Sequence, residues 1–136
     1  MSNSRFSISI HILTLLAKSE GEILSSDYMA DSININPVLI RKELINLRNH
    51  KLVVSKEGKN GGSYLSKPAA DIYLSDIYEA VNETAFLSKS KNKPNPVCPI
   101  GREINTHLDH LFNDAEKAVL GQLGKITLKK FANQFR

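Results

Sequence analysis

Cysteine and uninterrupted apolar runs are what this sequence has least of. Its one cysteine, Cys98, excludes an internal disulfide framework and any metal site that needs several cysteines of one chain. The apolar segment at residues 6–17 is interrupted by Ser7, Ser9 and His11, and it is shorter than the roughly 20 residues that a membrane-spanning helix needs. No small-residue cleavage site follows it, so we do not expect a secretory signal. The expected location is the cytoplasm, without a membrane partner.

The composition that remains is that of an ordinary folded protein with a local excess of positive charge. With 136 residues, 41% of them hydrophobic and 24% charged, the chain is long enough for one domain or for a compact domain with an added oligomerisation element. Residues 37–59 hold six basic and two acidic side chains, so this segment carries a net charge as large as the +4 of the whole chain. Such a local charge density favours binding to phosphates.

Residues 5–19 fit two interpretations. Apolar side chains at positions 6, 8, 10 and 12 alternate with polar ones, as in a half-buried strand, whereas Ile8, Ile12 and Leu16 share one face of a helix. Because the segment is longer than a typical strand, we predict a helix. Gly21 then suits the left-handed conformation that often ends a helix.

The clearest local signals predict a helix-turn-helix. A short helix is expected at residues 26–32, with Ser25 or Ser26 as its N-cap. Asn36 is a favoured N-cap and Pro37 a favoured first helical residue, so a third helix begins there and continues to about residue 49. Its buried face would hold Ile40, Leu44 and Leu47. The turn of about four residues between the two helices is typical of a helix-turn-helix.

The segments that follow predict a winged helix with a long C-terminal helix. Strands at 52–54 and 63–65 flank a glycine-rich turn, which makes a β-hairpin wing. A helix capped by Ser75 comes next, and a long helix starts near Pro99 and is expected to break at Gly121 and Gly124. The fold class is therefore mainly α with a small hairpin. The predicted divisions are a winged helix-turn-helix at 1–68, a connecting helix at 69–87, a flexible linker at 88–97, and a dimerisation helix with a closing helix at 98–136.

Apolar residues on the long helix recur with the spacing of a coiled-coil seam. The residues that we expect in a dimer interface are Ile104, Leu108, Leu111, Ala115, Phe112 and Val119.

The start of the third helix is the expected DNA reader, since that end of a recognition helix meets base edges in the major groove. Its outward residues, the predicted base contacts, are Asn36, Val38, Arg41 and Lys42. Other residues suit the phosphate backbone or the wing: Arg5, Ser25, Ser26, Arg48, Lys51, Lys59 and Asn60. The alternative for the charged residues is that they are solvated surface charges without a role in DNA binding. For Gly61 and Gly62, the alternative is that they only form the turn of the hairpin.

Four runs of residues together resemble one known family. They are Asn36-Pro37-Val38-Leu39-Ile40-Arg41-Lys42 with Leu44, Leu47 and Leu52-Val53, then the wing glycines Gly58, Gly61 and Gly62 with Tyr64-Leu65, then Ile72, Leu74, Ile77-Tyr78 and Ala80-Val81, and finally Cys98-Pro99-Ile100-Gly101. The chain resembles the bacterial winged-helix regulators that include the iron–sulfur cluster regulator, the nitric-oxide-sensing repressor and the cysteine-metabolism repressor. The resemblance implies a homodimer with crossing long helices that binds a palindromic operator, with base contacts at the start of the third helix. It favours a repressor.

Two positions depart from this resemblance. The cluster-binding members carry three cysteines where this chain has only Cys98, so we expect no cluster, no metal and no other cofactor. Many members place an arginine before the first wing glycine, whereas this chain has Glu57, which repels phosphates. Lys59 is the candidate to take over that role in the groove.

Cys98 precedes Pro99 and is expected to cap the long helix, whose dipole favours a thiolate. Lys89, Lys91 and Lys93 lie close in sequence. The expectation is an oxidant-sensing thiol that forms either an inter-subunit disulfide or a mixed disulfide with a small thiol. The alternative is a buried cysteine that acts as a small hydrophobic residue.

No nucleophile with its base and no metal spacing of histidines is evident, so we do not expect an enzyme. The predicted function is a DNA-binding transcription regulator. The alternative is a winged-helix module for protein–protein assembly without an operator of its own.

Overall fold

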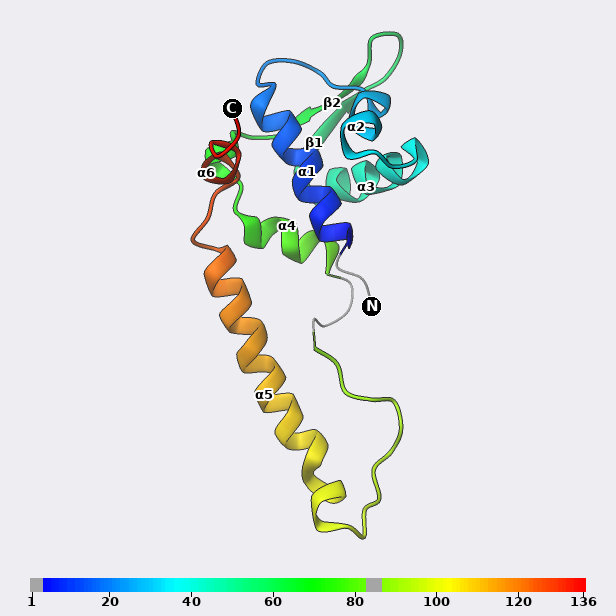
Figure 1. Ribbon diagram of the computed structural model, residues 1–136, viewed down its shortest axis with the longest axis vertical. Coiled ribbons are helices and arrows are strands. Elements are labelled where there is room, and N and C mark those ends of the chain that lie inside the picture. Colours follow the sequence, from blue (N-terminus) through cyan, green and yellow to red (C-terminus); the bar gives the residue numbers. More distant parts are fainter. Residues whose placement is uncertain (1–3, 83–86) are drawn as a thin grey trace.

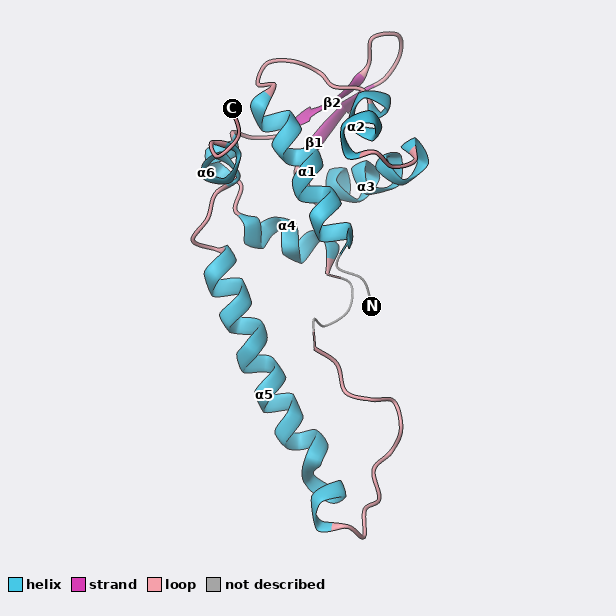
Figure 2. Cartoon of the chain, in the orientation of Figure 1, coloured by secondary structure: helices cyan, strands magenta, loops and turns pink. Residues whose placement is uncertain are grey.

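The computed structural model describes residues 4–82 and 87–136. Residues 1–3 and 83–86, which the sequence assigned to the winged helix and to the connecting segment, lie outside the described part. The elements are α1 (Ser4–Lys18), α2 (Ser26–Ile33), α3 (Pro37–Asn49), β1 (Val53–Lys56), β2 (Gly62–Leu65), the 3-10 turn η1 (Ala69–Asp71), α4 (Leu74–Val81), α5 (Pro99–Leu123) and α6 (Leu128–Ala132). The predicted mainly helical fold with a small hairpin is confirmed (Figures 1 and 2).

The ambiguous first segment is a helix, α1, in the middle of the body. Ile12, Leu13 and Leu16 are buried, and Phe6 and Ile8 pack against the same core. Helices α2, α3, α4 and α6 and strand β2 all contact α1. A helix covered on several sides carries apolar residues around most of its circumference, which explains why its sequence also resembled a strand.

The helix-turn-helix follows its local signals closely. The Ser25 hydroxyl accepts a hydrogen bond from the Tyr28 amide at 3.1 Å, and the Asn36 side chain accepts one from the Val38 amide at 2.8 Å. Asn34 closes α2 in the left-handed conformation. These caps satisfy amides that the first turns leave without helical partners. Ser25, not Ser26, is thus the N-cap of α2.

The wing is a two-stranded antiparallel hairpin in which Val53 pairs with Leu65. Its turn uses positive φ angles at Gly58 and Asn60. Gly62 is needed for a different reason, because a Cβ there would collide with the backbone of Leu24, which bridges to the hairpin. The wing is therefore fastened to the segment before α2.

Two helix boundaries differ from the prediction. α4 begins at Leu74 and not after Ser75, because the Asp76 carboxylate accepts a hydrogen bond from the Tyr73 amide at 2.9 Å and caps the helix two residues earlier. α5 continues through Gly121 to Leu123 and ends at Gly124. An exposed glycine costs a helix only about 1 kcal/mol relative to alanine, so Gly121 alone does not end it.

The C-terminal segment returns to the body, which the sequence did not indicate. The Leu74 amide donates to the Ile126 carbonyl at 2.9 Å, and the Leu128 amide donates to the Ile72 carbonyl at 2.7 Å. Leu128 is fully buried in the same core as α1. The closing helix therefore packs with the winged helix, while α5 projects from it (Figure 1). Among the described residues, no helix is both long and apolar enough to cross a membrane.

Candidate nucleic-acid interface

Helix α3 separates a buried face from an exposed one. Ile40, Leu44 and Leu47 are buried as predicted. The exposed face carries Val38, Arg41, Lys42, Ile45 and Arg48. Ile45, 48% exposed, was missed, although its position four residues after Arg41 places it on the same face. An apolar side chain exposed between two arginines suits contact with a thymine methyl group.

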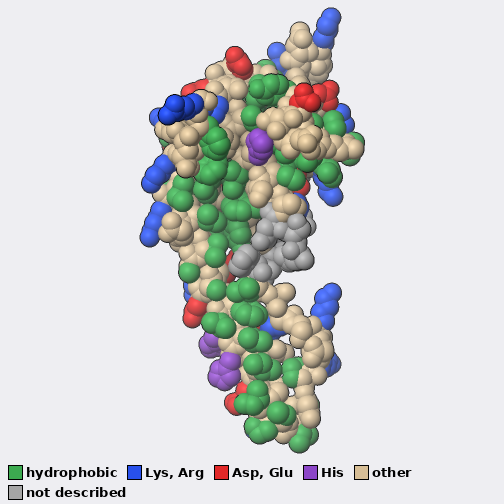
Figure 3. All heavy atoms as spheres, viewed as in Figure 1, with side chains coloured by type: hydrophobic (Ala, Val, Ile, Leu, Met, Phe, Trp, Pro, Cys, Tyr) green, Lys and Arg blue, Asp and Glu red, His purple; other side chains and the backbone are tan. Residues whose placement is uncertain are grey.

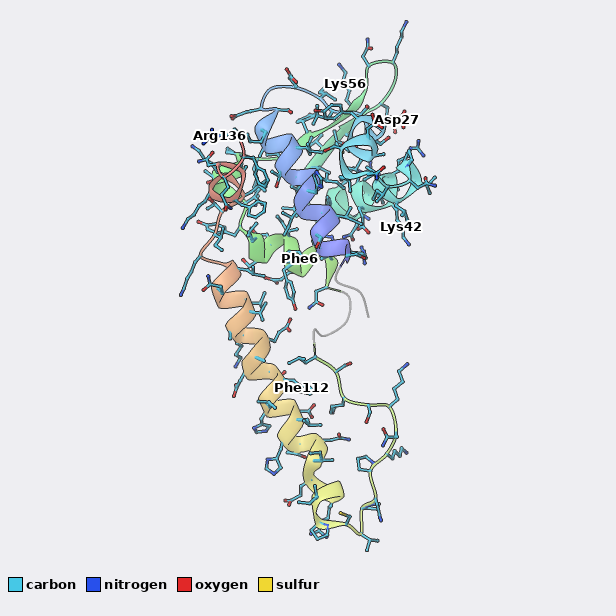
Figure 4. The ribbon with its side chains drawn as sticks, viewed as in Figure 1. Phe6, Asp27, Lys42, Lys56, Phe112 and Arg136 are labelled. Atoms are coloured by element: carbon cyan, nitrogen blue, oxygen red, sulfur yellow. The ribbon has the colours of Figure 1, made fainter. Side chains whose placement is uncertain are left out.

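Arg41 is loosely held. Its guanidinium Nη2 lies 3.7 Å from Oδ1 of Asp27 on α2, and the two side chains are 55% and 80% exposed. A pair so open to water contributes little to stability, so Arg41 remains available to another partner. Figure 4 shows Asp27, Lys42 and Lys56 on the side of the molecule formed by α2, α3 and the hairpin.

A shallow hollow lies between α3 and the hairpin. Its lining consists of Ser26, Arg41, Leu44, Ile45, Arg48, Ser55, Gly62 and Ser63. The Arg48 guanidinium donates a hydrogen bond to the Ser55 hydroxyl at 3.0 Å, which joins the helix to β1. The structure thus brings together Ser26, Arg41 and Arg48 of the predicted set, while the Ser25 hydroxyl is occupied as a cap.

The remaining wing residues are exposed and separate from this hollow. Lys51 adopts a positive φ of 62° in the turn after α3, and its carbonyl accepts a hydrogen bond from the Ser66 hydroxyl. Lys59 and Asn60 lie at the tip of the hairpin, next to Glu57. All three predicted residues are on the surface, on the hairpin or at its base.

Arg5, a predicted phosphate contact, forms an ion pair within the chain. Its Nε and Nη2 donate to the two carboxylate oxygens of Glu43 at 2.9 and 3.1 Å. Glu43 is only 5% exposed on the inner side of α3, and no local pattern in the sequence indicates that this acid in a basic helix is buried. Arg5 therefore holds α1 to α3 through a carboxylate of its own chain, and its contact with a DNA phosphate stays a prediction.

Cys98 caps α5 as predicted. Its Sγ accepts a hydrogen bond from the Gly101 amide at 3.4 Å, and the side chain is exposed, which argues against the buried alternative. The preceding turn is held by Asn95, whose side chain accepts from the Val97 amide at 3.0 Å. Lys89, expected near the thiol, instead forms an ion pair with Asp109 at 2.8 Å.

In the part of the chain that the structure describes, no segment buries the predicted seam of α5. None of the 25 residues of this helix is buried. Leu111 is 60% exposed, and the other five seam residues are half-buried. Figure 3 shows hydrophobic side chains along the length of α5 on the face in view.

A polar cluster fastens the C-terminal half of α5 to α4. The Tyr78 hydroxyl donates to the Glu116 carboxylate at 3.2 Å, and the Asn82 side-chain amide donates to the same group at 3.1 Å. Burial, followed by the hydrogen bond and the negative charge of Glu116, raises the pKa of Tyr78 to about 12. The phenol therefore remains a neutral donor throughout the physiological range.

Helix α4 also contacts α3. The Asn46 side-chain amide donates to the Ala80 carbonyl at 2.9 Å.

Within residues 4–82 and 87–136, no three His, Cys, Asp or Glu side chains lie close enough to hold a metal ion.

Comparisons with known proteins agree with this geometry. Residues 2–134 match the Rrf2 family, described as iron-dependent transcriptional regulators. YwnA of Bacillus subtilis, which carries the provisional name of an HTH-type transcriptional regulator, is 38% identical over 133 residues, covering 98% of each chain. The HTH-type regulator IscR of Serratia proteamaculans is 26% identical, over 97% of this chain and 77% of IscR. The solved structure of the B. subtilis global cysteine regulator CymR has the same fold, with a TM-score of 0.73 and 22% identity over 100% of this chain and 98% of CymR.

Proposed function

The chain belongs to the Rrf2 family of winged helix-turn-helix transcriptional regulators, and on that basis we propose that it represses transcription by binding a palindromic DNA operator as a homodimer. The observation that carries the proposal is the exposed face of α3, where two arginines, a lysine and two unburied apolar side chains lie side by side. This mixture of cations and apolar groups is what base edges in a major groove require. The chain is not an enzyme, since its relatives are regulators.

In the proposed complex, the start of α3 lies in the major groove. Arg41 grips the O6 and N7 of a guanine, Lys42 makes a looser contact, and Val38 packs on a thymine methyl. Asn36 lies at the very start of the helix, where its backbone approaches the base edges.

Other groups in the proposed complex contact phosphates. Ser25 and Ser26 stand at the N-terminus of α2, which attracts anions. Arg48 and Lys51 flank the end of α3, and Lys59 with Asn60 extends from the wing tip. These contacts orient the protein but carry no sequence information of their own.

Two copies join through α5 in this proposal. A 25-residue helix is about 37 Å long, and the absence of any buried residue along it leaves its apolar seam to be covered by another chain. A two-fold dimer places two copies of α3 about one helical turn of DNA apart, and this symmetry is the reason for a palindromic operator.

The description of the family names iron, but the ligands in this chain do not fit an iron–sulfur cluster. The chain supplies a single thiol, Cys98, and the described residues contain no cluster of three ligating side chains. Clusters of this kind need several protein ligands, most often four cysteines. We therefore propose that neither DNA binding nor signal sensing by this chain uses an iron–sulfur cluster.

The exposed thiol of Cys98 is the proposed signal receiver. In one route, a peroxide oxidises the Cys98 thiols of both subunits, which lose two protons and two electrons to form a disulfide while hydrogen peroxide is reduced to two waters. This route needs the two Cα atoms within about 7 Å. In the other route, the thiolate of each Cys98 attacks the disulfide of an oxidised small thiol, which forms a mixed disulfide and releases the other half as a free small thiol. Either product changes the cap of α5 and weakens operator binding.

Selection of bound sequences from random DNA, with reduced and with oxidised protein, tests these steps together. We expect an enriched palindrome with reduced protein, weaker binding after mild oxidation, recovery with a reductant, and no response in Cys98→Ser. Unchanged operator affinity after oxidation of Cys98, verified by mass, refutes the redox step alone. If no sequence is enriched, the assembly module without an operator becomes the better description.

Arg41→Ala tests the reading contact. We expect a loss of about 1–3 kcal/mol in operator binding and a relaxed preference at one base pair of each half-site. Lys129→Ala, on the exposed side of α6, is the matched control and should bind as the wild type does. A loss that is uniform over all DNA sequences would show that Arg41 contacts a phosphate.

A further inference from the structure

A second cavity lies on α1, away from the surface just described. It is a groove of about 520 Å³ between α1 and the C-terminal segment. Its lining consists of Ser7, Ile10, His11, Thr14, Leu15, Lys18, Phe131, Phe135 and Arg136. None of these residues comes from α2, α3 or the hairpin. Figure 3 shows hydrophobic side chains gathered between α1 and α6 on the face in view, with Lys and Arg side chains beside α6.

The walls of the groove are apolar and partly aromatic. The rings of Phe131 and Phe135 lie with their centroids 5.6 Å apart and tilted by 57°. Ile10 and Leu15 form the opposite wall on α1 and are half-buried, while Phe135 is 49% exposed. An aromatic ring left in water beside other apolar side chains gains stability when an apolar group covers it.

The charged side chains of the groove are all cationic. Lys18 and Arg136 line it, and no acidic residue does. The Lys18 ammonium donates one hydrogen bond to the Phe135 carbonyl at 2.8 Å, which places the cation at the groove and leaves two N–H groups to donate. A cation beside apolar walls is complementary to a ligand with one anionic end and one apolar end.

From this arrangement we propose that the groove between α1 and the C-terminal segment binds a small amphipathic organic anion, a carboxylate with an aliphatic or aromatic tail. The carboxylate accepts hydrogen bonds from Lys18, and the tail packs on Phe131 and Phe135. The volume lies within the range of about 300–1,000 Å³ that is usual for small-molecule sites. Mostly apolar lining with a few polar groups is also typical of such sites.

The position of the groove gives such a ligand a route to the helix-turn-helix. His11 lines the groove, and its Nε2 lies 3.2 Å from the Ser32 hydroxyl near the end of α2. A bound ligand therefore contacts α1 and the C-terminal segment directly and reaches α2 through one side chain.

Calorimetric titration of the full-length protein with octanoate and with phenylpropionate tests the site, with octanol and octylammonium as ligands that lack the negative charge. We expect both carboxylates to bind, and octanol and octylammonium to bind at least about tenfold more weakly. Lys18→Gln should weaken octanoate binding by about two- to fivefold, as expected for the loss of one exposed ion pair. Lys125→Gln, an exposed lysine outside the groove, is the matched control and should bind as the wild type does.

A second variant and a second measurement complete the test. Ser7→Trp adds a large side chain to an exposed position of the groove and should block octanoate binding without touching the core. Equal binding of octanol and octanoate, or unchanged octanoate affinity in Lys18→Gln, would overturn the proposal. If either variant instead converts dimers to monomers in sedimentation, the groove is an interface between copies and the proposal is wrong. DNA binding by the unliganded protein is a separate readout that none of these outcomes decides.

Discussion

The ion pair between Arg5 and Glu43 allows a sharp prediction about stability, because its two partners differ in their access to water. The Glu43 side chain is 7% exposed and that of Arg5 31% exposed, with both guanidinium–carboxylate hydrogen bonds formed. Arg5→Met leaves a carboxylate buried beneath α1, and removal of one partner from a buried pair costs about 3 kcal/mol. Glu43→Met leaves a guanidinium that water reaches, so we expect a loss of only about 1 kcal/mol.

Urea unfolding followed by circular dichroism measures both variants, at one protein concentration because the stability of a dimer depends on concentration. The double variant should be more stable than Arg5→Met alone, since it removes the stranded carboxylate, and the coupling energy should be about 2 kcal/mol. Arg48→Met, which removes an exposed arginine with one hydrogen bond to Ser55, should cost less than about 1 kcal/mol. If Glu43→Met is as destabilising as Arg5→Met, then the difference in hydration between the two side chains does not determine the loss of unfolding free energy, and the prediction is wrong.

Two further predictions concern α5 and its contact with α4. Leu111→Asp places a charge in the proposed dimer seam and should give monomers with poor operator affinity in sedimentation and DNA-binding assays, while Asn113→Asp on the same helix should remain dimeric. A dimeric Leu111→Asp variant would exclude the seam as the interface. For Tyr78, the folded-state pKa of about 12 exceeds the ordinary 10.0, so its contribution to stability is complete below pH 10 and is lost as the pH rises toward 12. Tyr78→Phe should show a smaller loss of unfolding free energy over that interval, and an identical loss would assign the alkaline instability to other groups.

The helix-turn-helix could be predicted almost residue by residue because its signals act over a few positions. The hydroxyl of Ser25 and the side chain of Asn36 each bind an amide two or three residues ahead, and Pro37 fixes its own φ angle. The exposed face of α3 follows from the same short periodicity. The sequence therefore predicts this part of the candidate DNA surface, and the helical periodicity of α3 would also have identified Ile45.

Contacts between distant segments could not be predicted in this way. Arg5 and Glu43 are 38 positions apart, and in the sequence each resembles an ordinary surface charge. Only the packing of α1 across α3 shows that the acid is buried and that the arginine is its partner. The same holds for the groove on α1, whose two walls come from opposite ends of the chain.

The course of the C-terminal segment affects how a signal at Cys98 reaches the DNA-binding face. The segment that directly follows α5 is held to the body by the bonds between Leu74 and Ile126 and between Leu128 and Ile72. The first turn of α5, with Cys98, lies at the far end of a helix about 37 Å long (Figure 1). The hydrogen bonds that join α5 to α4 lie at Glu116, far along the helix from that first turn. In the proposed homodimer, we therefore expect a change of the cap at Cys98 to act on α3 chiefly by reorienting one long helix against its partner. It follows that the redox response should require the dimer, so Leu111→Asp should abolish the effect of oxidation on the DNA binding that remains.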